Sequence, residues 1–197
     1  MTGRLAKEMR NNVFDFKDPG SNLKSPGFHN SKTRGFLVSD SQIDTIAEIA
    51  EKVSAEYNRR SRMEQTIKDL LSERQEVLVA MCDLAEFESK DVDAGSILET
   101  LKAFSQTLVD YTALGHFEIY ERIIDGKERR VKVNRIANSV YPSISATTEH
   151  FVEFNDKYDG ADDQESLVDL YKDLSSIGEA MAERIESEDK LLRVMTS

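Results

Sequence analysis

Cysteine and tryptophan are nearly absent from this sequence, which has Cys82 as its one cysteine and no tryptophan. A single cysteine cannot form an intramolecular disulfide or a cysteine metal cluster. Domains that are held together by disulfides or by cysteine-bound metal ions are therefore excluded. The three histidines are also few for a histidine-rich metal site, and His29 lies in the N-terminal segment. The fold must therefore depend on an apolar core.

Long apolar runs are absent as well. No stretch approaches the length that spans a bilayer, and the first residues lack the apolar region of a secretory signal. We therefore expect a cytosolic protein without a membrane partner. No segment of useful length alternates apolar and polar residues, so strands are not predicted either.

The charge is strongly acidic, with a net value of -11 over 197 residues. Residues 1–38 carry seven Lys/Arg and three Asp/Glu, a net charge of +4, so the remainder carries -15. Direct nucleic-acid binding is disfavoured because phosphate neutralisation needs a basic surface. An acidic domain suits a basic protein partner, or serves solubility alone.

Residues 1–38 contain frequent turn and breaker residues, including Pro19-Gly20 and Pro26-Gly27, with scattered phenylalanines. This composition predicts a mostly disordered, flexible tail. We expect residues 39–197 to form one helical bundle domain, because that length can bury a sizeable core.

Apolar residues recur at helical spacing through the whole of this domain. The pattern predicts helices over residues 43–57, 63–86, 97–124, 128–158 and 164–194. Residues 58–61 indicate an interruption between the first two, and Pro142 predicts a kink or two shorter helices in the fourth. The predicted fold class is all-α, an antiparallel four-helix bundle of the up-down type with an additional N-terminal helix.

Charged residues fall on the apolar stripes of two helices. Arg74 lies on the stripe of residues 63–86, and Arg184 and Glu188 lie on or beside that of residues 164–194. A guanidinium on an apolar face is costly unless it is paired, so Arg74 predicts an acidic partner across the bundle.

Residues 107–124 are the most apolar stretch that also holds several ionisable groups. One helical face takes Asp110, Phe117 and Glu121, and His116 and Tyr120 share another. Such a helix is central in a core, or it faces both a core and a partner. Gly115, in its middle, predicts close packing or a bend.

Catalytic and metal chemistry are weakly supported. Di-iron bundles need Glu-x-x-His pairs, whereas His116 and His150 follow Ala113 and Thr147 at that spacing. No phosphate-binding loop, dinucleotide fingerprint or activated nucleophile is present. We therefore expect no cofactor and no catalytic residue, and a carboxylate-bundle metalloprotein is only the third hypothesis.

The segment from Phe104 to Glu121, with Asp110-Tyr111 and Gly115-His116-Phe117 in it, resembles the regulator of sigma D and AlgQ family of bacterial anti-sigma factors. Residues 70–75 and 177–191 resemble the family's first long helix and its last. The resemblance covers about residues 60–195. This sequence departs from the family at Leu70, where family members commonly have tryptophan. The N-terminal tail has no counterpart in the family, and we expect it to be accessory.

The resemblance implies a non-enzymatic protein that binds the primary sigma factor of RNA polymerase, chiefly its C-terminal promoter-recognition region. The implied partner-binding residues are Asp110, Tyr111, His116, Phe117, Tyr120 and Glu121. The implied buried polar network consists of Arg74, Glu179, Arg184 and Glu188. An acidic adaptor for another signalling or metabolic protein is the alternative function, and the sequence leaves the oligomeric state open.

Overall fold

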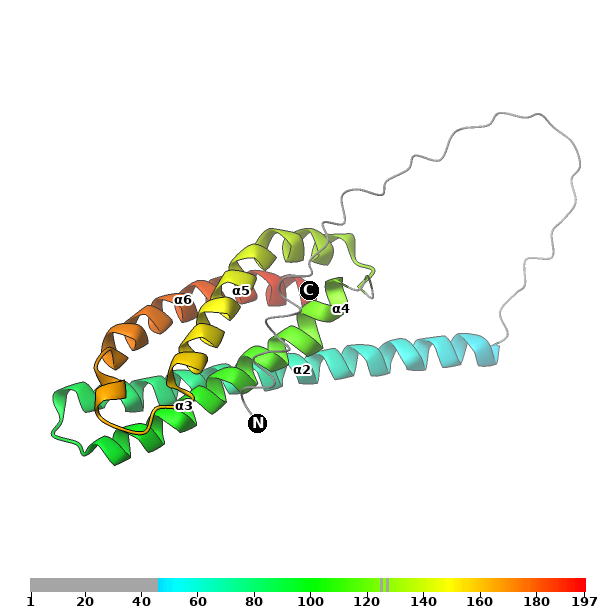
Figure 1. Ribbon diagram of the computed structural model, residues 1–197. Helices are drawn as coiled ribbons and strands as arrows, with labels where there is room; N and C mark the ends of the chain where they lie inside the picture. The colour runs from blue at the N-terminus through cyan, green and yellow to red at the C-terminus, as the bar shows by residue number, and fades with distance from the viewer. Residues whose placement is uncertain (1–45, 125, 127) are drawn as a thin grey trace, which may run out of the picture. The chain divides into compact units, whose positions relative to one another are not determined.

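The computed structural model describes residues 46–124, 126 and 128–197, and every regular element in these ranges is helical (Figure 1). The four long helices are α2 (Ile46–Glu86), α3 (Ala94–Leu114), α5 (Val131–Tyr158) and α6 (Leu170–Met195). The short elements are η2 (Phe87–Ser89), η3 (Gly115–Tyr120), α4 (Glu121–Ile124) and η4 (Glu165–Leu167). The all-α prediction is confirmed over the described residues.

The chain divides into two compact units. Glu64–Ser197 lie in the unit that contains most of the bundle, and the described residues 46–63 belong to the other. The predicted tail, residues 1–38, lies outside the described residues.

Helix α2 runs without a break through residues 58–61, so the prediction of an interruption and a separate N-terminal helix was wrong. Asn58-Arg59-Arg60-Ser61 contains neither glycine nor proline, and arginine is a good helix former. Glu56 also forms ion pairs with Arg59 and Arg60 one turn further on. Such pairs stabilise a helix, although each contributes only about 0.2–0.5 kcal/mol.

The first part of α2 is exposed throughout, over residues 49–62. Its predicted apolar stripe is present, but Ile49, Val53 and Tyr57 are 49%, 63% and 72% exposed. The stripe on residues 64–86 behaves differently, since Leu70, Val77 and Leu84 are fully buried.

The core of the larger unit lies between α3, α5, α6 and the part of α2 from Glu64 onward, with α5 and α6 side by side (Figure 1). Phe104 of α3 meets Phe154 of α5 edge to face, with ring centroids 5.7 Å apart. From α6, Leu170, Leu174 and Ile177 are buried in the same interior. These contacts fix the elements that carry the candidate site.

Helix α5 is one helix, Val131–Tyr158, and not the two shorter helices that Pro142 allowed. Pro142 is exposed, so the carbonyl it leaves unbonded one turn earlier lies toward solvent. Val140 and Ile144, on either side of it, are buried and hold the helix against the core.

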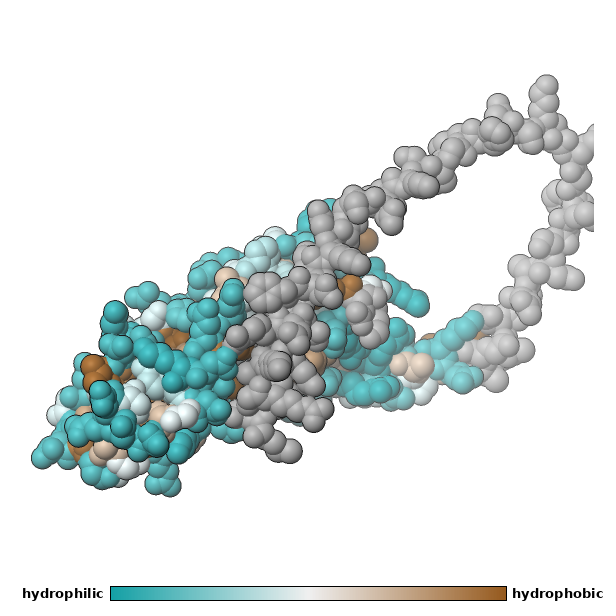
Figure 2. Space-filling view, viewed as in Figure 1, coloured by the Kyte–Doolittle hydropathy of each residue, from teal (hydrophilic) through white to brown (hydrophobic). Residues whose placement is uncertain are grey.

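Hydrophilic residues dominate the described surface on the face shown in Figure 2, with only isolated apolar residues. Scattered apolar residues of this kind are normal on a protein surface.

Replacing Phe104 by alanine should lower the free energy of unfolding by about 3–5 kcal/mol, because the ring is fully buried and a cavity would remain. Val168→Ala, at a position 80% exposed, is the control and should change it by less than about 0.5 kcal/mol. Urea unfolding followed by circular dichroism measures both, and equal effects would contradict the assigned core.

Candidate functional site

Helix α3 continues directly through η3 into α4, and η3 is a π-helical segment. The backbone N–H of Glu121 donates to the carbonyl of His116, five residues back, instead of four. A π-helical turn of this kind inserts about one extra residue into an α-helix and is frequent at functional sites. The chain from Ala94 to Ile124 is therefore one rod with a local change of helical register.

The π-helical turn brings two tyrosines to the same side. In an uninterrupted α-helix, Tyr111 and Tyr120 would point about 180° apart, since each residue turns about 100°. One inserted residue reduces this angle to about 80°. Both hydroxyls consequently reach the same carboxylate, that of Glu188 on α6.

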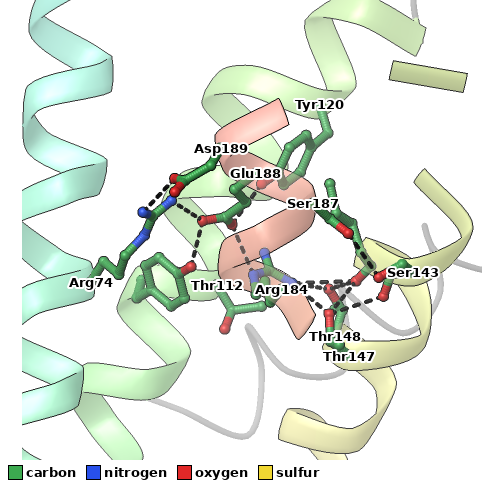
Figure 3. Close-up of polar contacts among 12 residues, drawn as sticks. Arg74, Thr112, Tyr120, Ser143, Thr147, Thr148, Arg184, Ser187, Glu188 and Asp189 are labelled. Carbon is green, nitrogen blue, oxygen red and sulfur yellow. Dashed lines mark hydrogen bonds and ion pairs between the residues drawn. The ribbon is translucent and has the colours of Figure 1, made fainter. Parts of the chain in front are cut away.

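Glu188 is fully buried, and its carboxylate accepts four hydrogen bonds (Figure 3). Arg74 Nη2 (2.9 Å) and the Tyr111 hydroxyl (2.5 Å) donate to Oε2. Arg184 Nε (2.9 Å) and the Tyr120 hydroxyl (2.6 Å) donate to Oε1. With both oxygens occupied, Glu188 has little capacity left to bind a ligand.

Arg184 is also fully buried and connects α6 to α5. Its Nη1 donates to the hydroxyl of Thr148 at 2.8 Å and to the carbonyl of Ile144 at 3.3 Å. The guanidinium carbon lies 5.4–5.8 Å from the ring centroids of Tyr111, Tyr120 and Phe151, at distances suited to cation–π attraction. Glu188 raises the pKa of Arg184 despite its burial, so the guanidinium remains charged.

Gly115 leaves the space that this arrangement needs. A Cβ atom there would lie 3.1 Å from the Tyr120 ring, 3.4 Å from Arg184 Nη2 and 3.5 Å from Leu70. Tyr120 and Arg184 are both fixed by Glu188, so neither can move away easily. The expected close packing at Gly115 is present, at the first residue of the π-helical segment.

Arg74 joins the network from α2. Its Nη1 donates to Asp189 at 2.8 Å, and its Nη2 donates to Glu188, which is the acidic partner across the bundle. The network thus holds two guanidinium and two carboxylate groups, which balance in charge. Burial raises the pKa of both tyrosines, so their hydroxyls stay protonated and able to donate.

The predicted network needs one correction. Glu179 is exposed, because it lies about 140° around α6 from Arg184. Asp189 takes part instead, and sequence reasoning missed it. Arg74 could have indicated a second acidic residue in the sequence. Its guanidinium has five N–H donors, so on an apolar face it can bind more than one acidic partner.

Three of the residues predicted to bind the partner are interior. Tyr111, His116 and Tyr120 are 0%, 5% and 3% exposed, so in this structure they cannot touch a partner directly. The first and last are tied to Glu188, and His116 packs edge to face on Phe117 with centroids 4.9 Å apart. The polar groups of these residues thus lie inside the protein. A helical projection of the sequence cannot distinguish such interior polar residues from residues that contact a partner.

The other three predicted contact residues are accessible. Asp110 is exposed and accepts from Gln106 Nε2 at 2.7 and 2.8 Å, while Phe117 and Glu121 are half-buried. Phe117 packs with Ala113 against Val152 of α5. The prediction of a partner-binding face therefore rests on these three residues.

Asp110 belongs to an acidic patch, which we define as Asp69, Glu73, Glu76 and Asp110. Burial raises the pKa of Glu73, and the charges of Glu76, Asp110 and Asp69 act in the same direction. No described lysine or arginine forms an ion pair with any of them. The i, i+4, i+7 spacing on α2 could have revealed this patch in the sequence.

Metal binding finds no support in the part of the chain that the structure describes, since no group of three or more potential ligands is brought together there. Within the same residues, no helix is sufficiently long and apolar to cross a bilayer.

Glu188→Gln should lower the free energy of unfolding by about 3–5 kcal/mol, because it leaves the buried Arg184 without its carboxylate. Glu186→Gln on the same helix, where Glu186 is exposed and paired with Lys190 at 2.8 Å, is the matched control. This substitution should leave the free energy of unfolding nearly unchanged, because an exposed ion pair contributes little to stability. Chemical denaturation distinguishes these outcomes, and a Glu188→Gln protein as stable as the control would refute the structural role of the network.

Stability should fall as the pH drops below about 6.5, in part through His116. Burial lowers the pKa of His116 in the folded protein, and no described residue bonds to its buried Nε2. Below the ordinary pKa the unfolded chain then binds more protons, so acidification favours unfolding. Urea titrations between pH 5 and 8 should show a shallower pH dependence for His116→Gln, and identical slopes would contradict this assignment.

Comparison with known proteins identifies relatives of this chain. Residues 49–196 match the family model described as regulator of RNA polymerase sigma(70) subunit, Rsd/AlgQ. The chain is similar to the regulator of sigma D of Yersinia enterocolitica, with 32% identity over 132 residues that cover 66% of this chain and 79% of the relative. It is 38% identical to the regulator of sigma D of Shigella boydii over 95 residues, 48% of this chain and 60% of the relative.

No solved structure shows significant similarity to this chain. The family match extends over all the residues of the Glu188 network, from Arg74 to Asp189, and includes Asp110. Its members are regulators and not catalysts, in agreement with the prediction of a non-enzymatic protein. The chain belongs to the Rsd/AlgQ family of regulators of the RNA polymerase sigma(70) subunit.

Proposed function

We propose that this protein binds the primary sigma factor of its cell through the acidic patch, Phe117 and Glu121, and so limits use of sigma by core polymerase. Family membership supports a sigma factor as the partner. Such a partner would place the protein in the cytoplasm, where RNA polymerase acts.

The observation that carries the proposal is the exposure of Asp110 among carboxylates that lack a described cationic partner. The C-terminal region of a primary sigma factor is the target that the family resemblance implies. A region that contacts promoter DNA carries basic residues for the phosphates, and an acidic patch offers them alternative partners. Occupation of the same basic residues by protein and by DNA would be mutually exclusive.

The buried network has an indirect part in this function. Glu188 fixes the rotation of the α3–η3–α4 rod through Tyr111 and Tyr120. That rotation also determines where Asp110, Phe117 and Glu121 emerge. A rigid surface loses little conformational entropy on binding, which favours affinity.

Asp110→Ala should weaken binding of the purified primary sigma factor by about tenfold, the size expected for a charge at the centre of an interface. Size-exclusion chromatography with light scattering and titration calorimetry would measure the complex and its affinity. The difference in affinity between the variant and the unmodified protein should be smaller at high salt, because salt screens the charge of Asp110 in the unmodified protein.

Asp83→Ala is the matched control, since Asp83 is an exposed aspartate of α2 that lies outside the patch. It should leave the affinity within about twofold of the unmodified protein. Far-UV circular dichroism must show unchanged helix content in both variants. Equal affinities for the two variants would refute the patch, and absence of any complex with sigma would refute the proposed function.

A further inference from the structure

Residues 129–148 contain no aspartate or glutamate, although the chain has 37 of them in 197 residues. The same twenty residues contain Arg129, Arg130, Lys132 and Arg135. They form the first two-thirds of α5 with the two residues before it. In a protein of net charge -11, this segment therefore stands out as a local positive region.

The positive region is on the surface. Arg129, Val131, Lys132 and Arg135 are all exposed, and Val131 is 72% exposed. Val131 and Arg135 are one helical turn apart, as are Lys132 and Arg135, so they share the outer side of α5. We call these four residues the basic face. None of its three charged side chains forms an ion pair with a residue that the structure describes.

The turn before α5 is anchored without using these charges. Arg130 pairs with Glu128 through two contacts of 3.1 Å and donates to the carbonyl of Met195 at 2.9 Å. Asn134 Nδ2 donates to the carbonyl of Glu128 at 3.0 Å. The carboxylate of Glu183 meets α5 at Ser143, about 12 Å along the axis from Arg135. The basic face is thus fixed in position while its own charges face solvent.

We infer that the basic face docks an acidic, partly apolar segment of a protein, at a site separate from the acidic patch. Charge complementarity supplies the attraction, and exposed Val131 provides an apolar contact between the basic side chains. A long nucleic acid fits less well, because it would extend from three basic residues onto the acidic remainder of the surface. A short peptide segment can be accommodated by the face alone.

Fluorescence anisotropy of the full-length protein with a labelled peptide of about 16 residues, rich in Glu with interspersed Leu, would test this inference. Reversal of the three charges in Arg129→Glu/Lys132→Glu/Arg135→Glu should weaken peptide binding by at least about tenfold. Val131→Ser should weaken it by a smaller factor, about twofold to fivefold, without any change of charge.

The matched control is Lys68→Glu/Lys102→Glu/Lys172→Glu, which reverses three exposed lysines elsewhere and gives the same net charge. It should retain peptide binding within about twofold. If the two triple variants lost peptide affinity equally, the loss would be due to net charge alone, and the inference would be overturned. Absence of peptide binding, or tighter binding of a single-stranded oligonucleotide that depends on the same three residues, would overturn it as well.

Discussion

The buried carboxylate of Glu188 is the constraint on which the larger unit depends. A charge in the interior is stable only when partners neutralise and hydrogen-bond it, and here three of the four partners come from other elements. Arg74 is supplied by α2, Tyr111 and Tyr120 by the α3–η3–α4 rod, and Arg184 by α6 itself. Because each hydrogen bond needs a defined geometry, the network fixes the rotation of these helices relative to one another.

The π-helical segment is the local adjustment that this constraint requires. Without the change of register, Tyr111 and Tyr120 would point to opposite sides of the rod, and one of them would lose Glu188. Gly115 permits the adjustment, because the Tyr120 ring and the Arg184 guanidinium occupy the space beside its Cα. Polar residues of the central stretch are consequently divided into an interior set and a surface set that includes Asp110.

The surface carries two oppositely charged features. The acidic patch contains Asp110, through which we propose that a sigma factor is bound, and the basic face lies at the start of α5. The charged residues within each feature all have the same sign, so each feature can select a partner of the opposite charge. A regulator with two such surfaces could engage sigma with one and an acidic protein segment with the other.

The sequence alone determined the all-α class, the four long helices, the family and the anomalous positions of Arg74, Arg184 and Glu188, because helical periodicity and unpaired charges are visible in one dimension. The predicted interruption at residues 58–61 was wrong, although the absence of glycine and proline there already favoured a continuous α2. Only the tertiary structure decided that Tyr111 and Tyr120 face inward, that Asp189 replaces Glu179 in the network, and that Asp110 joins carboxylates of α2. These outcomes depend on helix rotation, which is set by contacts between segments far apart in the chain.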